Sequence, residues 1–155
     1  MGLMSPSILL LRVVRESDAA ALHPLFFPSL PWPIFQAQFA RWQQNQARDR
    51  LVYLVGEYAG QLVAQGQLVL LNSHKAEIAH LEVAAAYRQL GFGSQLIQTL
   101  VNLAQARQVT CVEICVAQTN SRAYALYQRL GFRLHRALFS ATDDPGWILQ
   151  LRCEG

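Results

Sequence analysis

The sequence predicts a mixed α/β fold in which helices cover a mixed sheet. Short runs of aliphatic and β-branched residues recur along the chain and indicate strands. Between them lie longer segments whose apolar residues follow helical spacing. The chain has 155 residues, of which 52% are hydrophobic, and this is enough for a single domain with a substantial core. The expected order of elements is β-α-α-β-β-β-α-β-α-β-β.

The N-terminal part predicts one strand and two helices. Residues 8–14 form an apolar run that suits a buried first strand, and Ser17 or Asp18 can cap the helix that follows. Four prolines in the segment 24–33 exclude a continuous helix there. The next helical pattern covers 34–47.

The central part predicts a hairpin followed by a strand, a glycine-containing turn and a long helix. The hairpin strands are expected at 51–57 and 61–71, and strands also at 78–83 and, after the helix, at 110–116. The long helix has one apolar face, which consists of Leu96, Ile97, Leu100, Val101 and Ala104.

The C-terminal part predicts a short helix and a terminal hairpin. Asn120 or Ser121 is placed to cap the helix, and Gly131 suits the left-handed residue that ends it. The last two strands are expected at 132–139 and 146–152, around a turn at 143–146.

Composition excludes several classes of protein. The formal charge of +3 comes from scattered Lys and Arg residues, so no basic patch suggests a nucleic-acid partner. No apolar run approaches the roughly 20 residues that span a bilayer, and no signal peptide is recognised, so we expect a cytoplasmic protein without a membrane partner. Cys111, Cys115 and Cys153 lack metal-ligand spacing, and Cys111 and Cys115 are expected to be buried, reduced thiols.

The turn at 88–93 has the features of an anion site. Gly91 and Gly93 allow a ligand to approach the main chain, and the first N–H groups of the following helix have no intrahelical partner. Arg88 adds a guanidinium beside them. The spacing fits neither a P-loop nor a dinucleotide fingerprint, and an ordinary strand-to-helix loop is the alternative.

Two longer motifs give this turn a context. Residues 81–93 follow the pattern LxVxxxYRxxGxG, and residues 120–132 follow NxxAxxLYxxLGF. In spacing and order the two motifs resemble the GNAT superfamily of acyl-CoA-dependent N-acyltransferases. The first motif departs from the family at Ala85, where many members have proline. The resemblance implies a single domain over 1–155 and a mostly antiparallel sheet that opens at a parallel strand pair.

The resemblance also implies a site for acetyl-CoA, without a metal. The pyrophosphate is expected on main-chain amides after Arg88, the pantetheine arm along the preceding strand, and a second contact to that arm at Asn120. The Val83 amide can polarise the thioester oxygen. The implied contacts are Leu81, Val83, Arg88, Gln89, Leu90, Gly91, Phe92, Gly93, Ser94, Asn120 and Tyr127.

The same resemblance implies catalytic residues. Tyr127 occupies the position of the general acid, which protonates the departing thiolate; ordinary helix packing is the alternative role. Glu77 and Glu82 are the candidate general bases, and a water chain is the alternative to both.

The acceptor is expected to be a small-molecule amine or a peptide α-amine. Trp32, Trp42 and His80 are the candidate residues for binding it, although aromatic residues are more often simple core. An acyl-CoA sensor without turnover is the main alternative function, and an unrelated phosphate-binding domain is a third. A homodimer is compatible with the resemblance.

Overall fold

The computed structural model describes residues 8–139 and 144–153. In this part of the chain the elements follow the expected order, with short 3-10 helices at Glu16–Asp18 and Ala85–Tyr87. The strands are β1 (Leu10–Val13), β2 (Leu51–Tyr58), β3 (Gln61–Leu70), β4 (Lys75–Val83), β5 (Cys111–Ala117), β6 (Arg133–Leu138) and β7 (Gly146–Arg152). The helices are α1 (Ala19–Phe26), α2 (Trp32–Ala47), α3 (Phe92–Ala106) and α4 (Ser121–Arg129).

The described strands form a mixed sheet in the order β1-β2-β3-β4-β5-β7-β6. The chain forms two compact units, one made of residues up to 67 together with 80–96, the other of 68–79 together with the residues from 97 onward. Strands β3 and β4 and helix α3 each contribute residues to both units.

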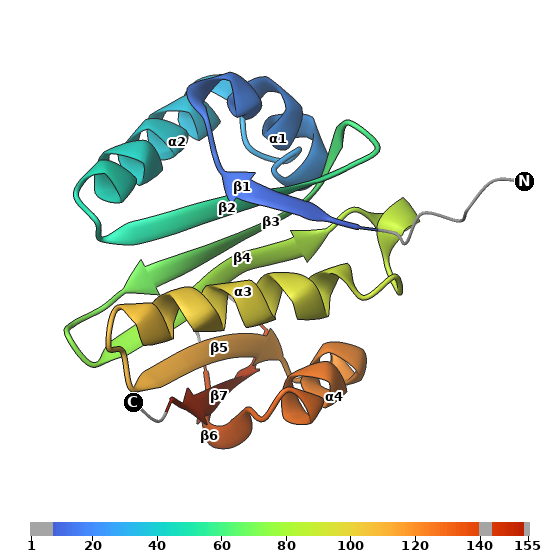
Figure 1. The fold of residues 1–155 in the computed structure, drawn as a ribbon. Helices are drawn as coiled ribbons and strands as arrows, with labels where there is room; N and C mark the ends of the chain where they lie inside the picture. Colours follow the sequence, from blue (N-terminus) through green and yellow to red (C-terminus); the bar gives the residue numbers. More distant parts are fainter. Residues whose placement is uncertain (1–7, 140–143, 154–155) are drawn as a thin grey trace, which may run out of the picture. The chain divides into compact units, whose positions relative to one another are not determined.

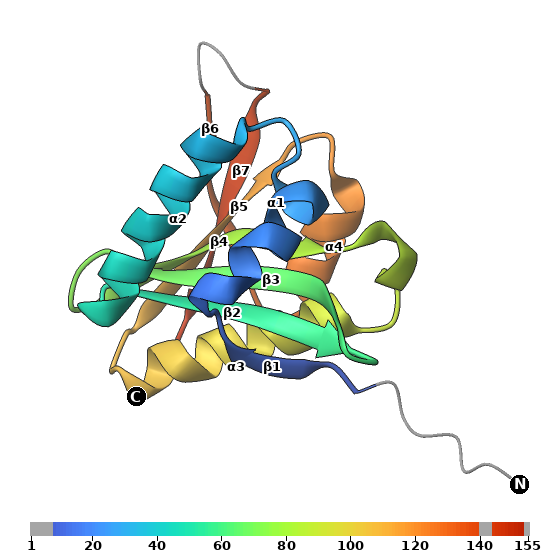
Figure 2. The same ribbon diagram turned by 90° about the horizontal axis from the view of Figure 1, so that it is seen from above.

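The first unit contains β1, β2 and the two N-terminal helices. Strands β1 and β2 pair antiparallel, with Leu10 opposite Glu57 and Val13 opposite Leu54. Helices α1 and α2 lie on one side of β1, β2 and β3 (Figure 1), and Figure 2 looks down on these helices from above. The core beneath them is mainly aromatic and aliphatic. Its buried members are Val14, Leu22, Phe26, Phe27, Phe35, Phe39, Tyr53 and Val55.

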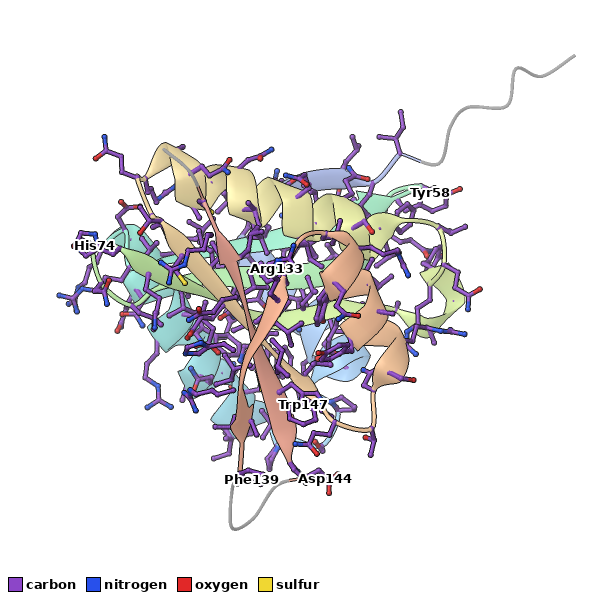
Figure 3. The ribbon with its side chains drawn as sticks, turned by 90° about the horizontal axis from the view of Figure 1, so that it is seen from below. Tyr58, His74, Arg133, Phe139, Asp144 and Trp147 are labelled. Carbon is purple, nitrogen blue, oxygen red and sulfur yellow. The ribbon has the colours of Figure 1, made fainter. Side chains whose placement is uncertain are left out.

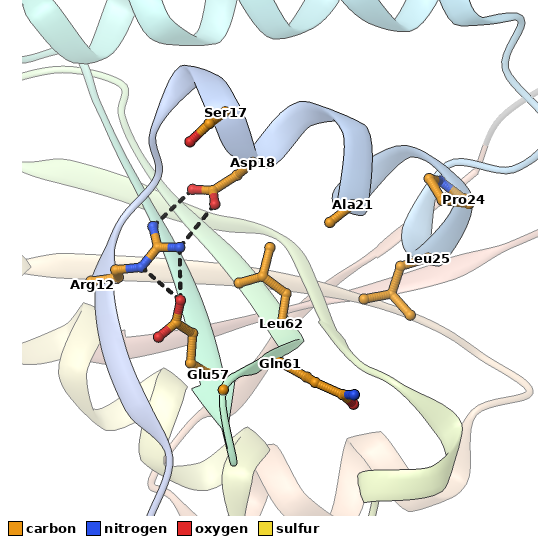
Figure 4. Close-up of a pocket in the computed structure, with 10 residues that line it drawn as sticks. Arg12, Ser17, Asp18, Ala21, Pro24, Leu25, Glu57, Gln61 and Leu62 are labelled. Atoms are coloured by element: carbon orange, nitrogen blue, oxygen red, sulfur yellow. Dashed lines mark hydrogen bonds and ion pairs between the residues drawn. The ribbon is translucent and has the colours of Figure 1, made fainter.

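An arginine on β1 ties three segments of this unit together. The Arg12 guanidinium donates two hydrogen bonds of 2.8 Å to the carboxylate of Asp18, and its Nε and Nη2 donate to Oε1 of Glu57 at 3.2 and 2.9 Å. The Arg15 amide also donates to Asp18, at 2.7 Å. Figure 4 shows Arg12 between the two carboxylates, at a surface groove under α1 that Leu25, Gln61 and Leu62 also line.

The Arg12 hydrogen bonds hold the pKa of Asp18 below its ordinary value. The stability gained from a carboxylate with a lowered pKa is present above the pKa of the unfolded chain, about 3.9, and is lost as the pH falls through the folded value. We predict that Arg12→Met lowers the free energy of unfolding at pH 7 by about 1.5–3 kcal/mol, the usual value of hydrogen bonds to charged groups. Urea denaturation at several pH values measures this loss.

The loss should shrink as the pH drops below about 4, where Asp18 of the unfolded chain becomes protonated, and should vanish once the pH passes the lowered pKa of Asp18 in the folded wild-type protein. The matched control is Arg41→Met on the exposed side of α2, which should change stability by no more than about 0.5 kcal/mol. An equal loss in the two variants, or a loss for Arg12→Met that does not depend on pH, would contradict a specific role for the Arg12–Asp18 pair.

Three expectations for the N-terminal region need correction. The segment 24–33 is not one continuous helix, as predicted, but α1 continues through Pro24 and ends only at Phe26. Burial of Leu22 and Phe26, 0% and 9% exposed, offsets the hydrogen bond that Pro24 cannot donate. Helix α2 begins at Trp32, two residues earlier than expected, because proline is well tolerated in the first helical turn and Pro33 lies there. Neither Ser17 nor Asp18 caps α1 with its side chain; Asp18 accepts from Arg12 and Arg15 instead.

The second unit contains the predicted parallel pair. Lys75–Ile78 of β4 pairs in parallel with Cys111–Ile114 of β5, which confirms that expectation. Strand β7 pairs antiparallel with both β5 and β6. Figure 3 shows β6 and β7 side by side, with Phe139 and Asp144 at one end and Trp147 on β7. Of the expected turn at 143–146, residue 143 lies outside the described residues. The separation of the parallel strands beyond Ile78 stays a prediction.

Local chemistry in this unit also follows the sequence. The side chain of Asn120 accepts a hydrogen bond of 3.1 Å from the Ala123 amide, which confirms it as the cap of α4. Gly131 has a φ angle of +100°, in the left-handed region that favours glycine.

Among the described helices, none combines the length and apolar composition that crossing a bilayer requires.

Candidate functional site

The regular geometry of β4 is interrupted at His80. This residue has a φ angle of +50°, a left-handed conformation that costs a non-glycine residue about 1–2 kcal/mol. Before the interruption Ala76 and Ile78 are buried, whereas His80 and Glu82, which continue the same alternation, are exposed. The interruption therefore turns the side chains of His80 and Glu82 outward, whereas a regular strand would bury them.

Aromatic rings of the N-terminal helices hold the His80 side chain. Its ring centroid lies 5.1 Å from Trp42 and 5.7 Å from Phe27, and these two rings lie 5.5 Å apart. The pKa of His80 is lowered by burial, so its imidazole is neutral at pH 7. Trp32 joins the same cluster through Phe35, with centroids 5.8 Å apart. The three candidate acceptor residues, Trp32, Trp42 and His80, thus belong to one aromatic cluster.

Glu82 lies next to a buried polar group of the same unit. Tyr53 is fully buried, packs against Trp42 at 5.6 Å and donates a hydrogen bond to Oε1 of Gln65. Burial raises the pKa of Tyr53, and the negative charge of Glu82 raises it further. The pKa of Glu82 itself is raised by burial, although Arg88 opposes the shift. Sequence reasoning missed Tyr53, because nothing separates it from an ordinary strand tyrosine.

The glycine turn has the backbone geometry that an anion site needs. Gln89 and Gly91 have φ angles of 67° and 83°, and a side chain at Gly91 would meet open space. The amide of Gln95 donates to the carbonyl of Gly91 at 3.1 Å and begins the hydrogen bonding of α3. The amides of 92–94 therefore precede the first intrahelical bond and carry the positive end of the helix dipole.

Packing from the hairpin anchors this turn. Phe92 is 2% exposed and lies 5.4 Å from the ring of Tyr58, which in turn lies 5.7 Å from Tyr87. The Phe92 side chain is therefore a core anchor, and only its backbone is left to contact a ligand. The Arg88 side chain is exposed, and its Nε donates to the carbonyl of Val83 at 3.1 Å, which braces the turn against the end of β4.

Tyr127 belongs to the second unit, on α4. Its side chain is 7% exposed and its ring lies 6.2 Å from Phe132. Burial raises the pKa of Tyr127, and the neighbouring Cys115 contributes to the shift. The phenol is therefore protonated at neutral pH, as a proton donor must be. Asn120 holds the start of the same helix through its cap.

Glu77 lies in the same unit, directly opposite Glu113 of β5. Burial raises the pKa of Glu77, and the Glu113 charge raises it further. Glu113 is held by Gln150 at 2.7 Å and by Lys75 at 3.4 Å. Cys115 interacts electrostatically with both Glu77 and Tyr127. Partial burial and the charge of Glu77 raise the pKa of Cys115, and Cys115 in turn raises the pKa of Tyr127.

The expectation that Cys115 is buried is wrong. Cys115 is exposed, whereas Cys111 and Cys153 are buried, and all three thiols are free. Residues of β5 alternate between two faces, and Cys115 lies on the face of Glu113 and not that of Val112, Ile114 and Val116. Within residues 8–139 and 144–153, no group of three His, Cys, Asp or Glu side chains is placed to hold a metal ion.

The strand–turn–helix unit and the capped α4 agree with a family match across most of the chain. Residues 19–132 match the acetyltransferase (GNAT) family. The chain belongs to this family. The comparison with curated protein sequences finds no match.

Solved structures of GNAT enzymes share the fold. A ribosomal-protein-alanine N-acetyltransferase from Brucella melitensis superposes with a TM-score of 0.81 at 22% identity, over 94% of this chain and 100% of that one. A spermidine N-acetyltransferase from Vibrio cholerae, in complex with CoA and spermine, gives a TM-score of 0.77 at 17% identity, over 93% and 95%. An Elizabethkingia anophelis GNAT acetyltransferase with acetyl-CoA bound gives 0.72 at 14%, over 94% and 98%. At these identities the likeness shows the fold.

The turn makes a testable prediction about acetyl-CoA. Gly93 lies in the first turn of α3, where valine fits the backbone, so Gly93→Val should fold and place a branched side chain beside the helix amides. We expect the affinity for acetyl-CoA, measured by calorimetry, to fall at least tenfold with little change in melting temperature.

Gly91→Val is a less clean test, because valine at a φ angle of +83° is strained even with open space around it. Gln98→Val, later in α3 and on an exposed part of the helix, is the matched control and should bind normally. Wild-type affinity in a folded Gly93→Val protein would exclude the turn as the anion site.

Proposed function

We propose that residues 1–155 form one N-acetyltransferase domain, which moves an acetyl group from acetyl-CoA to a primary amine by direct attack. The observation that carries the proposal is the left-handed turn at Gln89 and Gly91, which precedes the first hydrogen bond of α3 at Gln95. Solved structures of similar fold include complexes with acetyl-CoA and CoA, and the backbone of this turn supports the proposal that it binds the pyrophosphate. Arg88 supplies positive charge beside it.

The proposed reaction has one acid and one base. The neutral amine nitrogen attacks the thioester carbon, the C–S bond breaks, and the thiolate of CoA takes the phenolic proton of Tyr127. The second proton that the nitrogen loses as the amide forms returns the Tyr127 phenolate to its protonated state. A phenol titrates near 10 and a thiol near about 8.5, so this transfer is uphill by a small amount and proceeds as the thiolate departs. The raised pKa of Tyr127 keeps the donor protonated between turnovers.

The proton of the substrate ammonium passes to a carboxylate on β4. Glu77 and Glu82 are both candidates, and burial raises the pKa of each. A raised pKa brings the carboxylic acid closer to the pKa of the substrate ammonium, so the carboxylate is a stronger base toward it. Glu82 is the exposed residue of the two, since it follows the interruption at His80.

Replacing Tyr127 with phenylalanine keeps the ring and its packing against Phe132 but removes the proton donor. We predict that Tyr127→Phe lowers kcat by about 10²–10⁴-fold while acetyl-CoA affinity stays near the wild-type value. Steady-state kinetics with calorimetry separates the two quantities. Tyr124→Phe on the same helix is the control. An unchanged kcat would assign Tyr127 to packing, and equal losses of affinity and turnover would make its hydroxyl a ligand contact.

The base should be visible in the pH profile. A carboxylate base acts only when deprotonated, so kcat/KM should rise with pH through its pKa, and burial shifts this rise above the ordinary carboxylate range near 4.3. We predict that Glu82→Gln removes the rise and lowers kcat/KM by about 10²-fold or more. Glu77→Gln is the matched variant. If Glu77→Gln alone removes the rise, Glu77 is the base; if both variants keep it, solvent is the base.

One experiment tests the function as a whole. Thiol release from acetyl-CoA is measured with a library of primary amines, and the mass of each product is determined. Amine-dependent release with a gain of one acetyl group supports the transferase. Binding of acetyl-CoA without release by any amine would instead favour a sensor, and a preference for ATP over CoA would contradict both.

A further inference from the structure

An aromatic surface next to a single carboxylate is the most informative feature of the first unit. His80, Trp42 and Phe27 contact one another pairwise, with ring centroids between 5.1 and 5.7 Å. Phe27 is buried at the base, Trp42 is half-buried and His80 is exposed. Solvent thus reaches the cluster at His80 and in part at Trp42, while Phe27 is fixed in the core.

The backbone adds a second observation. A left-handed histidine is strained and persists only where the surroundings determine it, and such residues concentrate at functional sites. Here two rings from α1–α2 hold the strained residue in place. The left-handed conformation of His80 therefore marks this position of β4 as part of a candidate site.

Acidic groups of this unit are unevenly available. Asp18 accepts from Arg12 with both oxygens and from the Arg15 amide, and Glu57 accepts from Arg12 twice through one oxygen. Their charges are therefore opposed by a guanidinium. Glu82, two residues after His80, acts on Tyr53 beneath Trp42 and is exposed. Glu82 is therefore the exposed carboxylate of β4 that lies nearest in the chain to the aromatic surface.

From these contacts we propose, on the basis of the proposed function, that the acceptor is a primary monoamine with an apolar ring close to its amino group. The ring lies against Trp42 and His80, and the ammonium meets Glu82. A cation beside an aromatic face gains from the ring quadrupole, and offset or edge-on stacking suits the second ring. A neutral His80 adds no repulsion to the ammonium.

This surface disfavours polyamines. A triamine such as spermidine places three cations along an extended chain, and each cation that leaves water needs a partner. Two other carboxylates of this unit, Asp18 and Glu57, are already held by Arg12. A further cation of a polyamine could pair with Asp18 or Glu57 only by displacing Arg12, whereas a monoamine needs only Glu82.

Two sources could supply the same chemistry, a free arylalkylamine or the N-terminus of a peptide that begins with phenylalanine. The test compares kcat/KM for 2-phenylethylamine, the amide of the tripeptide Phe-Ala-Ala, butylamine and spermidine. We expect 2-phenylethylamine or the peptide to exceed both butylamine and spermidine by at least tenfold. The better of the two identifies the source.

The variant Trp42→Leu should reduce this preference by about tenfold, and His80→Ala should do the same without touching α2. Arg41→Leu, an exposed neighbour on α2, should leave it unchanged. Spermidine turned over as well as 2-phenylethylamine, or a preference unaltered in both Trp42→Leu and His80→Ala, would overturn the proposal. Thermal melts show which variants are folded. If Trp42→Leu does not fold, the result for His80→Ala alone decides the test.

Direct binding separates this proposal from the proposed function. Calorimetric titration of the CoA-saturated protein with 2-phenylethylamine and with spermidine requires no turnover. Tighter binding of 2-phenylethylamine, lost in His80→Ala, supports the aromatic site even if no amine is acetylated. Absence of any such preference in binding overturns it, even if acetylation of another amine confirms the transferase.

Discussion

The candidate site depends on the interruption of β4 at His80. If the strand were regular, His80 and Glu82 would follow Ala76 and Ile78 into the core, where an imidazole and a carboxylate are costly unless they are paired. One left-handed residue turns both outward. The conformational cost falls on a position that the rings of Phe27 and Trp42 hold from below, so the N-terminal helices and the strand are adapted to each other.

The glycine turn meets a different demand, for a backbone that is both open and rigid. Gly91 leaves its amide accessible, and Gln89 takes a left-handed conformation that orients the neighbouring N–H groups. Such a segment would be mobile on its own. Phe92, buried against Tyr58, anchors it at one end, and the bond from Arg88 to the carbonyl of Val83 braces it at the other. Gly91 therefore provides the open backbone of the turn, and Phe92 next to it provides the rigidity.

The features that could be predicted from the sequence are those decided by nearby residues. Asn120 and Gly131 were recognisable as the two ends of α4, because capping and left-handed termination depend on local backbone chemistry. The parallel pair and the order of elements followed from the two motifs and the apolar periodicity. Helix α1 passes through Pro24 because tertiary burial of Leu22 and Phe26 outweighs a local preference, and no local pattern reveals that.

The candidate site was predictable in its residues and less so in its arrangement. The motifs single out Tyr127, Arg88 and the glycines, but histidine carries no strong preference for a left-handed conformation inside a strand. The exposure of Glu82 follows from that conformation, so the sequence could not rank it against Glu77. The contact of His80 with Trp42 joins residues far apart in the chain, and only the packing of α2 on the sheet brings them together.

The exposure of Cys115 has a practical consequence. Because Cys111 and Cys153 are buried, a thiol-directed dye or spin label should attach to the native protein at a single position, with no need to remove other cysteines. That position is electrostatically coupled to Tyr127 and Glu77, so the label would report on the groups that surround the thioester in the proposed reaction. Its raised pKa means that labelling requires a mildly alkaline buffer, since only the thiolate reacts. The molecule thus contains its own attachment point for spectroscopy.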